Sequence, residues 1–309
     1  MADIEPGGHW SHTLGQDLRD CHRMVYYRVY GSWGGWTRSG PPTAHLLYQV
    51  KHSDNLHTYV GSLVHQAAQS IIQRVRGRLA IAPNQLMLER IEERMRFEID
   101  YSAKELWRRV DNPRRATLIL RNHLLGEDIH SHDIEEAIDK AKRALLAFLE
   151  TYLPTIRQMH PKHILLIDSL DSIVYRDFHL FLSPDFVAQR NEERVIIDWK
   201  TGKKGNVDQL KAYALYLIEW EERERNQVLE PSTITGRSVP LLHLDNEEVL
   251  HMTPEHIAEA RRRIDEDIDT LKSLHSDGVA RNEQAFEKTL HRGNCETCAF
   301  RFHCDLQPR

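Results

Sequence analysis

Residues Ser183 to Tyr213 read SPDFVAQRNEERVIIDWKTGKKGNVDQLKAY, and this stretch predicts a strand, a turn, a strand, a loop and a helix. The first strand is expected to end near Pro184–Val187, and the polar residues Gln189–Glu193 are expected to form the turn. The second strand, Arg194–Lys200, is rich in β-branched and aromatic residues. A helix is expected from about Val207, because apolar residues then recur at helical spacing.

Two charged residues interrupt the apolar second strand. Asp198 and Lys200 are two positions apart, so their side chains point to the same face of the strand. Asp185, on the neighbouring strand of the expected hairpin, can reach that face as well. Two converging carboxylates suit a hard cation such as Mg²⁺ or Mn²⁺. A lysine beside them can hold an attacking water or balance charge in a transition state.

Taken alone, Asp198 and Lys200 are better explained as a surface ion pair at a strand end. The following helix adds Gln209 and Tyr213, which are four positions apart and share a helix face. The order Pro-Asp, Asp-Trp-Lys-Thr-Gly and Gln-x-x-x-Tyr resembles the PD-(D/E)xK nuclease superfamily in its RecB-type branch.

This resemblance implies a role for each residue of the stretch. Asp185 and Asp198 would bind the metal ion, and Lys200 would be catalytic. Gln209 and Tyr213 would position the DNA or the lysine. The backbone carbonyl of Trp199 would complete the metal shell.

A histidine far upstream extends the same resemblance. The stretch Thr58–Gln66 predicts a helix that starts near Val60 and carries Gly61 and His65 one turn apart. A single histidine on a helix is often a solvated structural residue. Gly-x-x-x-His resembles the first motif of the nuclease family, which implies that the His65 imidazole joins the metal shell.

The chain has four cysteines, Cys21, Cys295, Cys298 and Cys304. The last three have the spacing C-x2-C-x5-C, and four thiolates suit either tetrahedral zinc or a 4Fe–4S cluster. Spacing alone does not decide between them. One cysteine upstream in Cys-x-Arg-x-x-Tyr-Tyr and three at the end is similar to iron–sulfur nucleases, including CRISPR-adaptation exonucleases and AddB-type nucleases. That similarity implies a structural 4Fe–4S cluster. Without it, Cys21 fits a buried core position of its helix.

Composition bounds the function. The chain has 309 residues, is 40% hydrophobic and 28% charged, and has a net charge of −5. This charge disfavours a generally basic nucleic-acid coat protein, but not a nuclease with a local basic groove. No apolar run approaches the roughly 20 residues that span a bilayer. The first residues lack the features of a secretory signal, so a cytoplasmic location is expected.

We expect an α/β fold with a restriction-endonuclease-like central mixed sheet flanked by helices. A single nuclease domain, 1–309, would contain a helical insertion at 83–160 and a cluster-binding segment at 290–309. Other expected elements are helices at 14–31, 84–110 and 133–153, and Asp133 and Glu136 fit a capping box at the start of the third. Strands are expected at 164–167, 178–182 and 239–244, and a last helix should begin at Pro254 after the N-cap Thr253.

Together these features predict a metal-dependent DNA nuclease. The resemblance implies an exonuclease acting on single-stranded DNA or DNA ends, in repair, CRISPR adaptation or antiphage defence, with a helicase or a defence protein as a partner. One alternative is a catalytically silent DNA-binding scaffold subunit, whose expected signature is loss of Asp185, Asp198 or Lys200. Another is a zinc-stabilised interaction protein.

Overall fold

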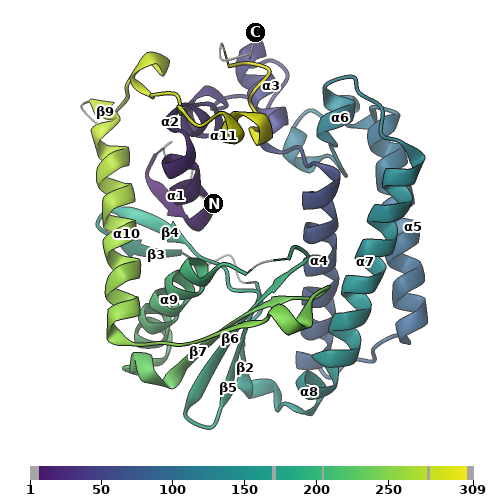
Figure 1. Ribbon diagram of the computed structural model, residues 1–309, viewed down its shortest axis with the longest axis vertical. Coiled ribbons are helices and arrows are strands. Elements are labelled where there is room, and N and C mark those ends of the chain that lie inside the picture. The colour runs from purple at the N-terminus through teal and green to yellow at the C-terminus, as the bar shows by residue number, and fades with distance from the viewer. Residues whose placement is uncertain (1–6, 169–171, 204, 277–278, 305–309) are drawn as a thin grey trace.

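The fold is built around a five-stranded mixed sheet, seen in a computed structural model that describes residues 7–168, 172–203, 205–276 and 279–304 (Figure 1). The strand order is β2-β5-β6-β7-β8, with β6 and β7 parallel and the other neighbours antiparallel. The strands are β2 Ile164–Leu166, β5 Phe186–Arg190, β6 Glu193–Lys200, β7 Ile234–Pro240 and β8 Glu248–His251. The predicted α/β fold with a central mixed sheet is therefore confirmed.

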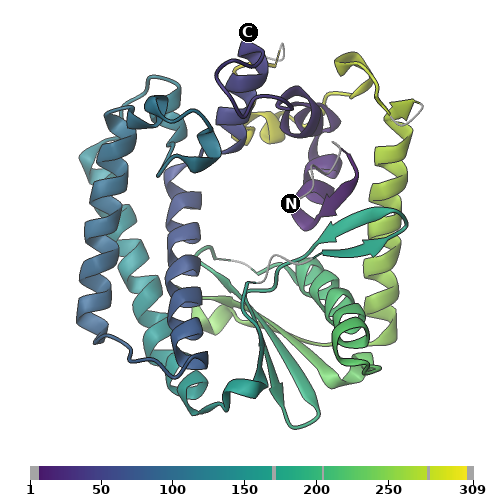
Figure 2. The ribbon, with the colours of Figure 1, turned by 180° about the vertical axis from the view of Figure 1, so that it is seen from behind.

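Helices cover both faces of this sheet. One face carries α9 (Val207–Arg225) and α10 (Pro254–Ser273), and the other carries α4 (Leu56–Arg76) and α7 (Ser131–Thr151). Figures 1 and 2 show these two layers on opposite sides of the strands, with α5 (Asn84–Ala103) packed outside α7.

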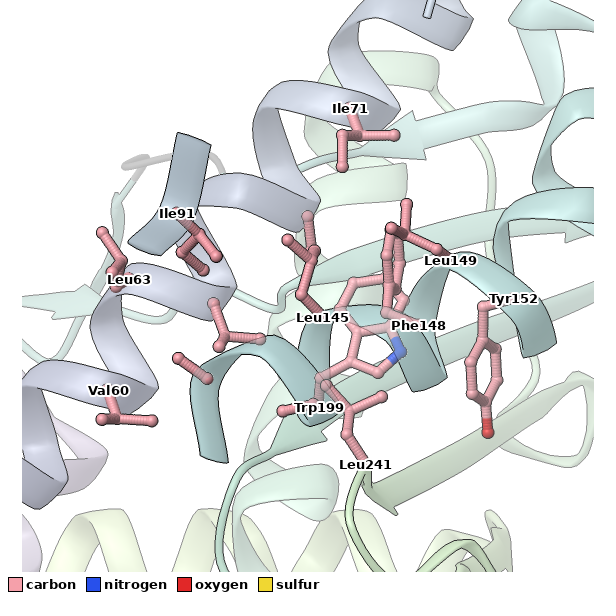
Figure 3. Close-up of a cluster of buried hydrophobic side chains, with 14 of the residues drawn as sticks. Val60, Leu63, Ile71, Ile91, Leu145, Phe148, Leu149, Tyr152, Trp199 and Leu241 are labelled. Atoms are coloured by element: carbon pink, nitrogen blue, oxygen red, sulfur yellow. The ribbon is translucent and has the colours of Figure 1, made fainter. Parts of the chain in front are cut away.

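The two faces of β6 alternate as the sequence pattern requires. Ile196 belongs to the cluster under α9 and α10, whereas Ile197 and Trp199 belong to the cluster under α4 and α7. Figure 3 shows the Trp199 indole beside Phe148 of α7, and their ring centroids are 5.2 Å apart. Trp199 therefore fixes the end of β6 against the α4–α7 layer.

Several strand positions differ from those expected. The strand at Phe178–Phe181 (β4) does not lead into the central sheet but pairs with β1 (His9–Ser11) and β3 (Ser172–Tyr175) in a separate three-stranded sheet. The strand expected to end near Val187 instead begins at Phe186. Its turn is limited to residues 191–192, because Asn191 takes a left-handed φ of 57° that closes the hairpin tightly. The strand expected at 239–244 is β7, and it ends at Pro240.

The N-terminal helix is broken where continuity was expected. It divides into α1 (His12–Asp20), α2 (His22–Val25) and the π-helical η1 (Tyr26–Gly31), because Cys21 is extended, with φ −170°. These elements, α3 (Pro42–Lys51) and α11 (Arg292–Thr297) lie together at the end of the molecule opposite the β5–β6 hairpin (Figure 1). Residues 305–309 of the expected 290–309 segment lie outside the described residues.

Helix boundaries in the middle of the chain also changed. Helix α5 ends at Ala103, not at Val110, because Glu105 takes a left-handed φ of 51° before the short η2 (Leu106–Arg109). Helix α7 begins at Ser131 with no side-chain cap, so the Asp133–Glu136 capping box was wrong. The Thr253 cap is confirmed, since its side chain accepts a hydrogen bond from the His256 amide.

The remaining elements are short. They are η3 Pro113–Arg115, α6 Arg121–Leu124, α8 Leu153–Gln158, η4 Pro161–His163, η5 Pro231–Thr233, η6 Leu244–Asn246, β9 His275–Ser276, β10 Val279–Ala280 and η7 Glu283–Ala285. Among the described residues, no helix combines the length and the apolar character needed to cross a membrane.

The Trp199 contact yields a stability prediction. Phe148 is 0% exposed, so Phe148→Ala should lower the free energy of unfolding by about 3–5 kcal/mol through lost burial and a residual cavity. Phe97→Ala on α5 is the matched control, since Phe97 is 65% exposed, and should change it by less than about 0.5 kcal/mol. Urea unfolding followed by circular dichroism measures both. Equal effects would contradict the assigned core.

Candidate active site at the carboxyl end of β6

The strand register brings the predicted acidic residues together. Asp198 and Lys200 lie at the carboxyl end of β6. Phe186 pairs with Ile197, so Asp185, immediately before β5, lies beside Asp198 just beyond the end of the ladder. The expectation that Asp185 reaches the face of Asp198 agrees with this arrangement.

Lys200 connects the sheet to α9. Its Nζ is 2.7 Å from Asp198 Oδ2 and donates to Gln209 Oε1 at 2.9 Å. Gln209 Nε2 in turn donates to the Tyr213 hydroxyl oxygen at 2.6 Å. The Asn206 side chain accepts a hydrogen bond from the backbone N–H of Gln209 and so caps α9. This cap fixes the first turn of the helix, which carries Gln209. The lysine is therefore held between a carboxylate and an amide oxygen.

His65 reaches the site from the other face of the sheet. Its Nδ1 is 3.1 Å from Asp185 Oδ1, and Asp185 Oδ2 accepts from the Trp199 amide at 2.8 Å. One turn earlier, a Cβ on Gly61 would lie 3.2 Å from Thr201 Oγ1, so the glycine permits close approach of α4 to the end of β6. Through these hydrogen bonds, His65, Asp185 and Trp199 link α4 to the start of β5 and to β6.

Burial controls the ionisation of this group. Asp198 is 1% exposed, and burial followed by the neighbouring Asp185 charge raises its pKa to about 6, despite Lys200. Burial acts against protonation of His65, but the Asp185 and Asp198 carboxylates outweigh it and raise the His65 pKa. Burial, with the same two charges, also raises the pKa of Tyr213 well above its ordinary value. The tyrosine is therefore a neutral hydrogen-bonding group.

The donor set has the chemistry of a divalent-cation site. Burial and the Asp185 charge both disfavour the ionised form of Asp198, and a cation between two carboxylates offsets such repulsion. In the present arrangement both Asp185 oxygens are already hydrogen-bonded, to His65 and to the Trp199 amide. Among the described residues no three or more His, Cys, Asp or Glu side chains are grouped so as to hold a metal ion.

The four cysteines line one cavity of about 280 Å³ between α2 and the C-terminal segment. All four are free thiols of intermediate exposure. Cys21 occupies the break between α1 and α2, so the alternative of a helical core position was wrong. Burial first, and then the nearby thiols, raise the pKa of Cys298. The shared cavity joins the two ends of the chain, whereas the described cysteines show no grouping that already matches a metal site.

Comparison with known proteins agrees with this geometry. The profile of the PD-(D/E)XK nuclease superfamily matches residues 10–305, almost the whole chain. The chain therefore belongs to the PD-(D/E)XK nuclease superfamily, whose members usually use Mg²⁺ or Mn²⁺. No curated protein sequence matches the chain.

Two neighbours of the site were missed in the sequence. Ser238 on β7 pairs in register with Asp198, and its Oγ is 3.4 Å from Asp198 Oδ2. This contact depends on the β6–β7 pairing, which no local pattern reveals. His12 Nε2 is 2.9 Å from the Asn206 side chain, in the loop before α9. The N-cap rule could have identified Asn206, but not its contact with His12.

The buried Asp198 carboxylate predicts a pH-dependent stability. Its folded pKa of about 6 lies above the ordinary value of 3.8, so its cost to folding is absent below about pH 4 and complete above about pH 6. In EDTA, Asp198→Asn should therefore raise the free energy of unfolding by roughly 1–3 kcal/mol at pH 8, and by little at pH 4. Thermal melts at both pH values measure this.

Asp139→Asn on α7 is the control for that experiment, because Asp139 forms an exposed ion pair with Arg143 and is 63% exposed at its side chain. It should shift the melting temperature little at either pH. A wild-type protein more stable than Asp198→Asn at pH 8 in EDTA would contradict the buried-charge interpretation.

Proposed function

We propose that this chain is a Mg²⁺- or Mn²⁺-dependent deoxyribonuclease of the RecB-type branch that hydrolyses phosphodiester bonds. One observation carries the proposal. Two hydrogen-bonded chains meet at the adjacent β6 residues Asp198 and Trp199. One chain runs from His65 through Asp185 to the Trp199 amide, and the other runs from Asp198 through Lys200 and Gln209 to Tyr213.

The assigned metal ligands are His65, Asp185, Asp198 and the carbonyl oxygen of Trp199. When bound, a divalent ion supplies Lewis-acid charge next to the scissile phosphate. A water attacks phosphorus in line, one new P–O bond forms, and the bond to the leaving oxygen breaks. Each residue of this chain then has a separate task in that displacement.

Lys200 orients the attacking water and balances the negative charge that develops on the phosphate oxygens. Asp198 and Gln209 fix its ammonium group at 2.7 and 2.9 Å, which limits the rotamers of a flexible side chain. Tyr213 acts through Gln209, because its hydroxyl accepts the amide proton at 2.6 Å. Tyr213 is thus a positioning residue, buried at 5% exposure.

We further propose that Cys21, Cys295, Cys298 and Cys304 hold a structural 4Fe–4S cluster, with zinc as the alternative occupant. Support comes from the four thiols that line one cavity and from their soft-ligand chemistry. A metal held there would join Cys21 to the C-terminal segment, so metal affinity would contribute to folding. The cluster would fasten segment 290–309 to α2.

The proposed substrate is single-stranded DNA or a DNA end, cleaved by an exonuclease in the cytoplasm. We propose one nuclease domain over 1–309, in which the helical insertion 83–160 shapes the substrate channel. Repair, CRISPR adaptation and antiphage defence are the proposed settings, with a helicase or defence protein as a partner. The resemblance of the motifs supports these assignments.

Replacement of the lysine tests the activity. Lys200→Ala should reduce Mg²⁺-dependent digestion of single-stranded DNA by at least about 100-fold, because the positive charge at the phosphate is lost. The variant should still fold, with a lower melting temperature, because Asp198 loses its buried ion-pair partner. Tyr213→Phe should reduce it by roughly 3–10-fold, since it frees Gln209 without removing the lysine. Gel-based digestion with and without EDTA measures both.

Lys162→Ala, an exposed lysine after α8, is the matched control and should cleave at the wild-type rate. Cleavage by Lys200→Ala at the wild-type rate, or full wild-type activity in excess EDTA, would refute the proposed active site.

Replacement of Cys21 tests the cluster. Cys21→Ser should lose bound iron and the visible absorbance of an iron–sulfur cluster, and the N-terminal helices should become protease-sensitive. DNA cleavage should weaken as well, because His12 connects α1 to the loop that precedes Gln209. Iron analysis and limited proteolysis measure this.

Thr297→Ser, in the same cavity, is the control and should keep the metal. A purified wild-type protein with stoichiometric zinc and no iron would assign zinc. A Cys21→Ser variant with full metal content and wild-type protease resistance would remove Cys21 from the ligand set.

A further inference from the structure

A group of basic side chains gathers at the C-terminal end of α3, away from the proposed catalytic residues. Helix α3 packs against η1 and η3, which brings basic side chains of the three elements together. The group consists of Lys51 and His52 at that helix end, Arg28 of η1, Arg114 of η3 and His9 of β1, and we call it the α3 cation cluster. The Lys51 ammonium has no ion pair or hydrogen bond to any described residue. Such isolation is unusual for a lysine that is partly buried.

The charges in this cluster act on one another. Burial, followed by Arg28 and Arg114, lowers the pKa of Lys51 to about 8. Burial and the same cations lower the pKa of His52 to about 4, and Lys51 contributes to a similar fall at His9. The charges that shift these three pKa values lie on basic side chains.

One acid is close to the cluster. Arg28 Nε forms an ion pair with Asp17 Oδ2 at 2.6 Å. Burial raises the pKa of Asp17 to about 6, so ionisation of this carboxylate costs free energy even though it neutralises the Arg28 charge. Lys51 and Arg114 are left without a counter-charge among the described residues. A cluster of this kind is costly without an anion and becomes favourable when one binds.

The location of the cluster indicates which anion it would meet. Helix α1 lies between α3 and the central sheet in both views (Figures 1 and 2). His9 of the cluster is three residues from His12, which contacts Asn206 at 2.9 Å. The Lys200 charge also acts on His12. Burial lowers the pKa of His9 and of His12 to about 4, so both imidazoles are neutral at pH 7. The start of α1 therefore places neutral hydrogen-bonding groups near Lys200 and near Lys51.

We propose that the α3 cation cluster binds a backbone phosphate of the same nucleic-acid strand whose scissile phosphate lies at Lys200. The nucleic-acid nature of the ligand rests on the proposed function, whereas the anion site rests on the cluster itself. Arg114 is exposed and Lys51 is half-buried. The cluster would set how far the strand must extend beyond the cleaved bond.

Binding of a fluorescein-labelled single-stranded oligonucleotide, measured by anisotropy, tests this in a Lys200→Ala background that cannot cut the probe. Lys51→Gln should weaken binding by roughly 3–10-fold and reduce the slope of log K against log salt by about 0.7–1, because one phosphate contact is lost. Lys104→Gln, an exposed lysine paired with Asp100, removes the same charge and should change neither quantity.

Thermal melts without DNA separate binding from structure. Lys51→Gln should melt at or above the wild-type temperature, because it removes repulsion between cations. A shorter oligonucleotide that ends before the cluster should bind wild type and Lys51→Gln equally. Arg114→Gln, at an exposed position, repeats the test if Lys51→Gln fails to fold.

Three outcomes would overturn the inference. Wild-type affinity and salt slope in both Lys51→Gln and Arg114→Gln would show that no phosphate binds there. A marked fall in the melting temperature of both variants would assign the cluster a structural role. Tight, Lys51-dependent binding of a polyglutamate peptide in place of DNA would assign it to an acidic protein. A different outcome separates the two proposals. If the wild-type protein does not cleave DNA but binds it in a Lys51-dependent manner, the proposed nuclease activity is refuted and the phosphate site stands.

Discussion

The buried Asp198 carboxylate at the end of β6, with the Asp185 carboxylate beside it, is the constraint on which the rest of the site depends. Asp198 is 1% exposed and lies beside Asp185, which raises the free energy of its charged form. Lys200 lowers the free energy of the charged Asp198, because its Nζ lies 2.7 Å from Asp198 Oδ2. The ion pair also fixes both side chains in one geometry. Charged groups in functional sites commonly lower the stability of the folded protein. A packed hydrophobic pair of the same volume would be more stable, but it would not supply the charge that the chemistry needs.

The two hydrophobic layers give this charged site its rigidity. On one face, Leu210 and Tyr213 of α9 are buried against Ile196, so Gln209 is directed toward Lys200. On the other face, Trp199 packs between Phe148 and Phe186, and Val64 of α4 joins the same cluster next to His65. Each polar residue therefore follows or precedes a residue locked in a core, which holds the polar atoms in place at little entropic cost.

Long-range polar contacts hold the two ends of the chain near this framework. Asp267 of α10 accepts from the Trp10 indole at 3.0 Å and from Arg19 at 2.8 Å, so α1 is fastened to the helix that covers the sheet. Arg23 of α2 donates to the Phe286 carbonyl at 2.9 Å and to Glu283 at 2.8 Å. These bonds bring Cys21 into the cavity lined by the C-terminal cysteines. They also hold His12 beside the loop that precedes Gln209.

The sequence by itself determined the local chemistry of this protein. The β6 strand, the start of α9 at Val207, the Thr253 cap and the family were predictable, because each depends on residues close together in the chain or on motifs in a fixed order. Only the tertiary structure decided the break at Cys21, the separate β1-β4-β3 sheet, and the contact of Ser238 with Asp198. Which strands pair, and where a helix breaks, depends on how each segment packs against segments far away in the sequence. Local periodicity carries no information about those distant segments.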